Sequence, residues 1–224
     1  MIKFADVCKT YWLGEEKVEA LKHASFDIGK GEYVGILGPS GSGKSTLMHM
    51  IGLLDKPTSG TVNLFGKDVS KLSDDQISSL RNENVGFVFQ QFNLIEKFTV
   101  LENVVLPTIY AKHKLNFDPQ KRGMELLEQM GIGERASFHP NKISGGQQQR
   151  AAITRALMME PELILADEPT GNIDTKTGNE IMKLLEGFNR DMGVTVIVVT
   201  HEPDVASRTR RQIFVKDGEI VNKL

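Results

Sequence analysis

The chain has 224 residues, of which 40% are hydrophobic and 25% charged, and its net charge is −2 with histidine neutral. This length predicts one large domain or two intimate lobes, with a core that needs no disulfide. The single cysteine excludes an internal disulfide and favours a reducing compartment. No apolar run reaches the roughly 18 residues that span a membrane, and the first residues lack a signal-peptide pattern. We therefore expect a folded chain that is neither secreted nor membrane-spanning and has no surface for nucleic acid.

Two kinds of strand pattern follow one another along the chain. Apolar and polar residues alternate at 2–4, 26–28 and 61–65, which is typical of an antiparallel sheet with one solvated face. Four later runs are continuously apolar, as in a parallel sheet that is buried on both faces: Tyr33–Leu37, Val85–Phe89, Leu163–Ala166 and Val194–Val199. Helical patterns at 45–54, 147–158 and 175–191 fall between them. The alternation of strand and helix predicts an α/β core.

A helical stretch interrupts this alternation. Residues 101–111, 119–130 and 147–158 have helical patterns with no strand between them. We therefore predict that the single domain over 1–224 consists of an α/β core with an antiparallel β-subdomain (1–90 and 159–224) and an inserted helical subdomain (91–158).

A phosphate-binding loop follows the first buried strand. The run of eight residues from Gly38 to Ser45 fits G-x-x-x-x-G-K-[ST] at every fixed position. Such a loop turns its N–H groups inward, and the helix that follows adds partial positive charge. Lys44 is expected to reach the β- and γ-phosphates, and the Ser45 hydroxyl to ligate Mg²⁺. A dinucleotide fingerprint would need glycine where Thr46 stands. The predicted nucleotide-binding residues are Gly38, Pro39, Ser40, Gly41, Ser42, Gly43, Lys44, Ser45 and Thr46.

Polar residues end two of the later buried strands. Asp167 and Glu168 follow Leu163–Ala166; the first suits indirect coordination of Mg²⁺, and the second suits a general base that activates water. Taken alone, such a pair is most often a helix N-cap region. His201 follows Val194–Val199 and Thr200, at the edge where open α/β sheets bind ligands.

A resemblance to a known family appears at residues 143–150. This stretch, Ile-Ser-Gly-Gly-Gln-Gln-Gln-Arg, looks like the L-S-G-G-Q signature of ABC-type ATPases, with isoleucine in place of the usual leucine. Gln90 resembles the Q-loop glutamine of that family, residues 171–174 its D-loop, His201 its switch histidine, and Tyr11 the aromatic residue that stacks on adenine. The motifs stand in the family's order along the whole chain. From its residues alone, Ser144 is a good N-cap for the helix that follows.

The resemblance implies a P-loop NTPase fold of the RecA-like type that hydrolyses ATP with Mg²⁺. It also implies a head-to-tail homodimer, in which each nucleotide lies between the phosphate loop of one copy and the signature residues Ser144, Gly145, Gly146 and Gln147 of the other. Glu168, His201, Lys44 and Gln90 would be catalytic; Ser45, Gln90 and Asp167 would hold the metal. Asp174 would couple the two sites across the dimer interface.

The same resemblance implies a partner in the membrane. The family uses the region near residues 90–110 to grip a membrane-spanning permease subunit, which places the chain at the cytoplasmic face of the cell membrane. The pattern looks most like the lipoprotein-release and macrolide-export group. Two other roles in the superfamily stay open: a cell-division ATPase that signals through a membrane partner to cell-wall enzymes, and a DNA-repair or chromosome-organising ATPase, although no long heptad region is present. A P-loop kinase would leave residues 143–150 unexplained.

Overall fold

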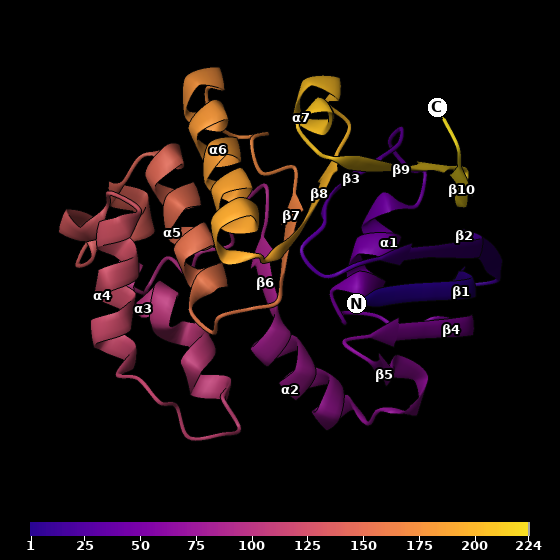
Figure 1. Cartoon of the computed structure of the whole chain (residues 1–224), viewed down its shortest axis with the longest axis horizontal. Helices are drawn as coiled ribbons and strands as arrows, with labels where there is room; N and C mark the ends of the chain where they lie inside the picture. Colours follow the sequence, from indigo (N-terminus) through magenta and orange to yellow (C-terminus); the bar gives the residue numbers. More distant parts are fainter. Residues whose placement is uncertain (224) are drawn as a thin grey trace. The chain divides into compact units, whose positions relative to one another are not determined.

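A computed structural model describes residues 1–223 (Figure 1). By its internal contacts the chain divides into two compact units, which we describe separately. The first unit comprises residues 1–78 and the segment from Thr195 onward, and the second comprises residues 79–194. The predicted division into an α/β core with an antiparallel β-subdomain (1–90 and 159–224) and a helical subdomain (91–158) stays a prediction.

The first unit contains an antiparallel sheet. Its strands β1 (Ile2–Leu13), β2 (Glu16–Ile28), β4 (Ser59–Leu64) and β5 (Lys67–Asp68) lie in the order β2-β1-β4-β5, as Figure 1 shows. Ile2 and Phe4 are buried on one face while their neighbours point to solvent. The antiparallel sheet predicted from alternation is confirmed, with strands longer than predicted.

The first unit also contains parallel strands. β3 (Tyr33–Leu37) pairs in parallel with β8 (Thr195–Thr200) and β9 (Arg211–Lys216), and β10 (Glu219–Val221) is antiparallel to β9. Every residue of β3 and β8 is buried, so the burial predicted from the continuous apolar runs is confirmed. The helices are α1 (Lys44–Ile51) and the short α7 (Pro203–Ser207). A 3₁₀ turn covers Val69–Lys71.

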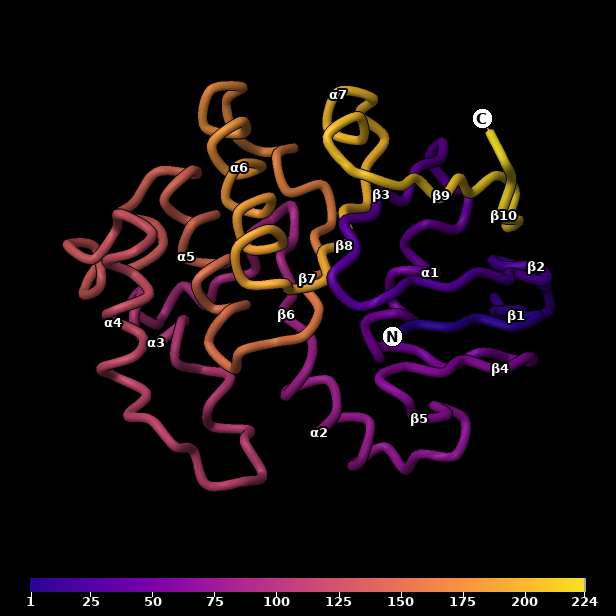
Figure 2. The backbone as a smooth tube through the Cα atoms, in the orientation of Figure 1, coloured from indigo at the N-terminus to yellow at the C-terminus, as the bar shows by residue number. Residues whose placement is uncertain are grey.

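The second unit places helices around a parallel strand pair. β6 (Val85–Val88) pairs with β7 (Leu163–Asp167). Between them the structure has α3 (Val100–Val105), α4 (Pro119–Gln129) and α5 (Gly145–Leu157), which lie side by side in the trace of Figure 2. Three 3₁₀ turns, Leu106–Tyr110, Gly133–Arg135 and Pro140–Lys142, connect them without a strand. The long helix α6 (Thr175–Met192) follows β7.

Helix boundaries differ from the sequence expectation in two places. The helix predicted over 101–111 is an α-helix only to Val105, because Pro107 has no N–H and the chain continues as a 3₁₀ turn. Helix α2 (Asp74–Asn84) was not predicted, because it is polar on nearly every side. Within residues 1–223, no helix is both long and apolar enough to cross a membrane.

Candidate functional site

The predicted phosphate loop lies between β3 and α1. Gly43, the N-cap of α1, has a φ of +106°, and a β-carbon there would lie 2.5 Å from the Ala20 carbonyl oxygen. Only glycine fits both that backbone conformation and that approach. Gly43 has no side chain, so the N-cap residue of α1 makes no side-chain hydrogen bond to the first N–H groups of the helix. The loop therefore presents the donors and the positive helix end that bind anions.

Two side chains of this loop have the chemistry of a phosphate site. The Lys44 ammonium donates to the carbonyl oxygens of Gly38 at 2.7 Å and Pro39 at 2.8 Å, which places its charge over the loop. The Ser42 hydroxyl is buried and has no hydrogen-bond partner within residues 1–223. A buried polar atom without a partner is rare in folded proteins. The loop thus combines a cation with an unsatisfied hydroxyl, as a site for a polar ligand requires.

His201 leaves the sheet at the same edge as the phosphate loop. Leu37, the last residue of β3, is paired with Thr200, the last residue of the parallel strand β8. The chain therefore turns into the phosphate loop and into His201 from neighbouring strand ends. The first unit brings these two predicted features together.

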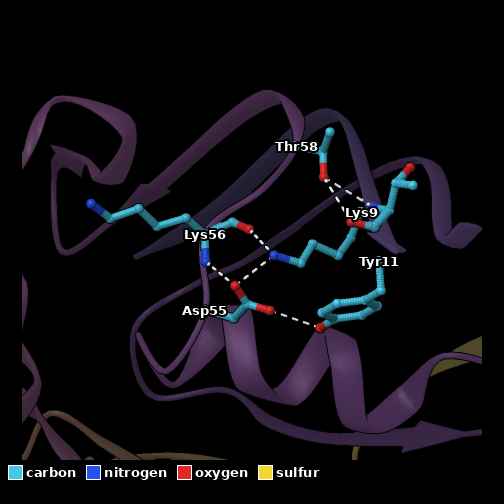
Figure 3. Close-up of polar contacts among 6 residues, drawn as sticks. Lys9, Tyr11, Asp55, Lys56 and Thr58 are labelled. Atoms are coloured by element: carbon cyan, nitrogen blue, oxygen red, sulfur yellow. Dashed lines mark hydrogen bonds and ion pairs between the residues drawn. The ribbon is translucent and has the colours of Figure 1, made fainter. Parts of the chain in front are cut away.

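Tyr11 lies in a polar cluster that Figure 3 shows. Its hydroxyl donates to Asp55 Oδ2 at 2.7 Å, and the Lys9 ammonium, which also binds Asp55 and donates to the Lys56 carbonyl, lies 4.9 Å from the centre of the tyrosine ring. Burial raises the pKa of the Tyr11 phenol, and the hydrogen bond to Asp55 raises it further. One face of the ring therefore carries an ammonium, and the phenol is anchored.

Asp55 accepts hydrogen bonds from Tyr11, from the Lys9 ammonium and from the Lys56 amide. Burial works to raise the pKa of its carboxyl, but hydrogen bonds from Lys9, Tyr11 and the Lys56 amide together hold that pKa below its usual value. Sequence reasoning missed both Lys9 and Asp55. Lys9 could have been found from the sequence, because it lies two residues before Tyr11 on the same strand, and residues two apart on a strand share a face.

The second unit brings the predicted Q-loop and acidic residues together. Val88 in β6 is paired with Ala166 in β7, so Gln90 and the pair Asp167 and Glu168 leave neighbouring parallel strands at one edge. The Asn172 side chain donates to the Gln90 carbonyl oxygen at 2.9 Å. Glu168 itself has a φ of +42°, which is uncommon for a residue with a β-carbon. It opens a turn, residues 168–171, in which the Gly171 amide donates to the Glu168 carbonyl oxygen at 3.0 Å. We call this segment the acidic turn.

The signature residues begin helix α5. The Ser144 hydroxyl accepts from the Gln147 amide at 3.3 Å, and Gln147 Oε1 accepts from the Ser144 amide at 3.0 Å. This reciprocal pair is a capping box, so the predicted N-cap role of Ser144 is confirmed. Gly145 and Gly146 form the first turn of the helix.

Two further residues of α5 reach the other motifs of the second unit. The Gln149 side chain donates to the Pro169 carbonyl oxygen in the acidic turn at 2.7 Å. Arg155 donates to the carbonyl oxygens of Phe92 at 2.9 Å and Asn93 at 2.5 Å, just after Gln90, and burial lowers its pKa. Sequence reasoning missed both residues, because their partners are 20 or more positions away along the chain.

Comparison with known proteins agrees with this arrangement of motifs. The profile of the family described as ABC transporter matches residues 21–171, about two thirds of the chain. The chain belongs to the ABC transporter family. It is 51% identical to the ABC transporter ATP-binding protein MJ0796 of Methanocaldococcus jannaschii, over 98% of this chain and 95% of that protein. It is also 50% identical to the macrolide export ATP-binding/permease protein MacB of Chlorobaculum tepidum, of which it spans only 34%.

The fold of this ABC transporter chain matches solved ATP-binding cassettes. The dimeric post-hydrolysis structure of the cassette MJ0796, bound to ADP and Pi, superimposes with a TM-score of 0.91 at 48% identity, covering 98% of this chain and 96% of that one. A second dimeric structure of MJ0796 superimposes with a TM-score of 0.90 at 49% identity, with the same coverage. The predicted P-loop NTPase fold, with its parallel core, antiparallel sheet and helical part, is confirmed.

The last predicted site residue of the ABC transporter chain, Asp174, is the N-cap of α6. Its carboxylate accepts from the Thr177 amide at 3.0 Å. The Thr177 side chain, together with this amide, lowers the pKa of Asp174. The structure thus gives Asp174 a local role, and its predicted role across a dimer interface stays a prediction.

The predicted metal ligands have the chemistry of a magnesium site. Ser45, Gln90 and Asp167 offer oxygen donors with a single carboxylate, whereas Zn²⁺ prefers histidine and cysteine. Within residues 1–223, no group of three or more histidine, cysteine, aspartate or glutamate residues suitable for a metal occurs.

Proposed function

We propose that this chain is the ATP-binding subunit of an ABC transporter, and that its ATP-driven dimer closure and hydrolysis power a separate membrane subunit. The observation that carries the proposal is the phosphate loop, in which the Lys44 ammonium, the unpaired Ser42 hydroxyl and the start of α1 occupy one turn. The near full-length similarity to a cassette bound to ADP and Pi supports it.

The predicted site residues have the donors that Mg-ATP would need. Lys44 and the loop amides would hold the β- and γ-phosphates, exchanging the carbonyl partners of the ammonium for phosphate oxygens. Ser45 and Asp167, with Gln90, would hold Mg²⁺, which takes few carboxylates and retains several waters. When bound, the metal would neutralise charge on the phosphates. The Tyr11 ring, anchored by Asp55, would stack on adenine.

The chemical step needs a base, an orienting group and charge stabilisation. Glu168 would take a proton from the attacking water. His201 would hold the γ-phosphate and this water in line, and Lys44 with the loop amides would stabilise the charge on the transferred phosphoryl group. The signature residues of a second copy would complete the site in a head-to-tail dimer, with Asp174 coupling the two sites.

The membrane partner would dock near residues 90–110 on the cytoplasmic face of the cell membrane. Three large apolar side chains in or near this range are exposed: Ile95 by 40%, Ile109 by 72% and Tyr110 by 67%. Apolar side chains exposed in one region are typical of a protein interface. The similarity to MacB supports export, or extraction of a lipoprotein or peptide, as the work that is powered.

The decisive experiment replaces the proposed base. We expect Glu168→Gln to lower steady-state ATP hydrolysis by about 10² to 10⁴, the usual contribution of a general base. ATP binding should persist, and light scattering after size exclusion should show an ATP-dependent dimer, because a carboxylate near the triphosphate has been neutralised.

The matched control is Glu162→Gln, at the opposite end of β7. It removes the same charge beside the same strand and should leave hydrolysis unchanged. A Glu168→Gln protein that hydrolyses ATP at the wild-type rate would refute the assignment of the base. A wild-type protein that fails to bind ATP would refute the proposed function itself.

A further inference from the structure

A buried glutamine connects α5 to the turn that follows the proposed catalytic base. Gln149 is completely buried, and its Nε2 donates to the Pro169 carbonyl oxygen at 2.7 Å. Pro169 directly follows Glu168, so this hydrogen bond holds the far side of the residue next to the glutamate, at the peptide between Pro169 and Thr170. Its donor and acceptor both lie inside the second unit.

The backbone that this bond holds is strained. Glu168 has a φ of +42°, a left-handed conformation that a β-carbon disfavours. Such conformations persist only where the surroundings impose them, and they cluster at functional sites. Two hydrogen bonds hold carbonyls of this turn: the Gly171 amide donates to the Glu168 carbonyl, and the Gln149 side-chain amide donates to the Pro169 carbonyl.

Fold stability does not account for a glutamine at this position. Gln149 Oε1 is buried without a hydrogen-bond partner within residues 1–223, and so is the Thr170 hydroxyl in the same turn. A buried amide that is only half satisfied stabilises a fold less than an apolar side chain of similar volume. The residue type is therefore explained by what its one hydrogen bond does to the acidic turn.

We propose that Gln149 is a positioning residue for ATP hydrolysis. It holds the Pro169 carbonyl, and through it the left-handed backbone of Glu168 that directs the carboxylate toward the attacking water. The inference rests on the proposed function, in which Glu168 is the base. Because Ser144 is the N-cap of α5, one helix with its cap carries both the signature residues and the group that fixes the base.

The first test is Gln149→Met, which keeps the length and approximate volume of the side chain but removes its donor. We expect kcat to fall by about tenfold to a hundredfold, since displacement of a catalytic group by roughly 1 Å costs about 10² in rate. The Kd for ATP, the ATP-dependent dimer and the thermal midpoint should stay at their wild-type values. Two effects on the midpoint oppose each other, because the variant removes the unpaired Gln149 Oε1 but leaves the Pro169 carbonyl without its donor.

Thr154→Val is the matched control. Thr154 is also completely buried on α5, but its hydroxyl donates only within the helix, to the Arg150 carbonyl oxygen at 2.7 Å. We expect its kcat to equal that of the wild type. Equal losses of kcat in the two variants, or wild-type kcat in Gln149→Met, would overturn the proposal.

A double variant tests whether Gln149 acts through Glu168. Residual hydrolysis is measured in single turnovers for Glu168→Gln, with and without Gln149→Met. We expect equal rates, because there is no carboxylate left to position. A further loss by the same factor as in the wild-type background would overturn the inference. Normal hydrolysis by Glu168→Gln alone would instead refute the proposed base, so the two failures are distinguishable.

Gln149→Glu provides a second readout if the methionine variant does not fold. A protonated glutamic acid can donate to the Pro169 carbonyl, whereas the carboxylate cannot. We therefore expect the kcat of this variant, relative to the wild type, to rise as the pH is lowered from 8 toward about 6, since burial raises the pKa of a carboxyl. A pH profile parallel to that of the wild type would overturn the proposal.

Discussion

Replacing Asp55 by asparagine tests the cluster that anchors Tyr11. The carboxylate accepts from Tyr11 on one oxygen and from Lys9 and the Lys56 amide on the other. Asparagine has the same shape but no charge and only one acceptor oxygen, so at least one donor loses its partner. The Lys9 side chain is only 12% exposed and that of Asp55 27%, so water replaces the lost interactions poorly.

The expected loss follows from these contacts. A hydrogen bond to a charged group contributes about 1.5–3 kcal/mol, so we expect Asp55→Asn to lower the free energy of unfolding by about 2 kcal/mol. For a chain of this length, that corresponds to a fall of roughly 4–8 °C in Tm. Differential scanning calorimetry at pH 7 measures it. The freed phenol should also weaken ATP binding several-fold without changing kcat.

The pH dependence gives a second check with a definite sign. The pKa of Asp55 in the folded protein lies below its ordinary value of 3.8, so its stabilising effect is complete above that value. The effect is lost as the pH falls through the lower, folded pKa. The difference in stability between wild type and Asp55→Asn should thus be constant near neutral pH and shrink below pH 3.8.

Asp74→Asn is the control for this experiment. Asp74 forms an ion pair with Lys56, but its side chain is 94% exposed, so we expect no measurable change in Tm. A wild-type Tm for Asp55→Asn at pH 7, or a difference that persists unchanged in acid, would refute the reasoning.

Three further variants test contacts of the second unit. Gly86→Ala places a β-carbon 2.4 Å from the Ala156 carbonyl oxygen, so β6 and α5 must move apart, and we expect denaturant unfolding to show a loss of about 1–3 kcal/mol; an unchanged midpoint would contradict this packing. Asn103→Ala removes a fully buried amide that binds four backbone groups before α3. We expect the free energy of unfolding to fall by about 3 kcal/mol in the same assay, and a fall of less than about 1 kcal/mol would contradict this. Arg155→Met leaves the carbonyls of residues 92–93 without their donor, so limited proteolysis after Gln90 should become faster; an unaltered cleavage rate would show that other contacts hold this loop.

Much of the architecture could be predicted because it follows from local patterns. Continuous apolar runs identified β3, β6, β7 and β8, since a strand buried on both faces needs apolar side chains on both. Helix α2 escaped prediction because its polar surface carries no clear periodicity. The end of α3 at Val105 depends on Pro107, whose effect on a helix boundary a periodicity count does not include.

The candidate site also has parts that the sequence predicts and parts that it does not. The sequence by itself determined the phosphate loop and the cap at Ser144, because a short motif and a capping box are set by residues that lie close together along the chain. Only the tertiary structure decided that Asp55 anchors Tyr11, 44 positions away, and that Gln149 holds the Pro169 carbonyl in the turn after Glu168. The physical reason is that a single polar residue has many potential partners along the chain, and packing of the strands and helices selects the one that lies within hydrogen-bonding distance.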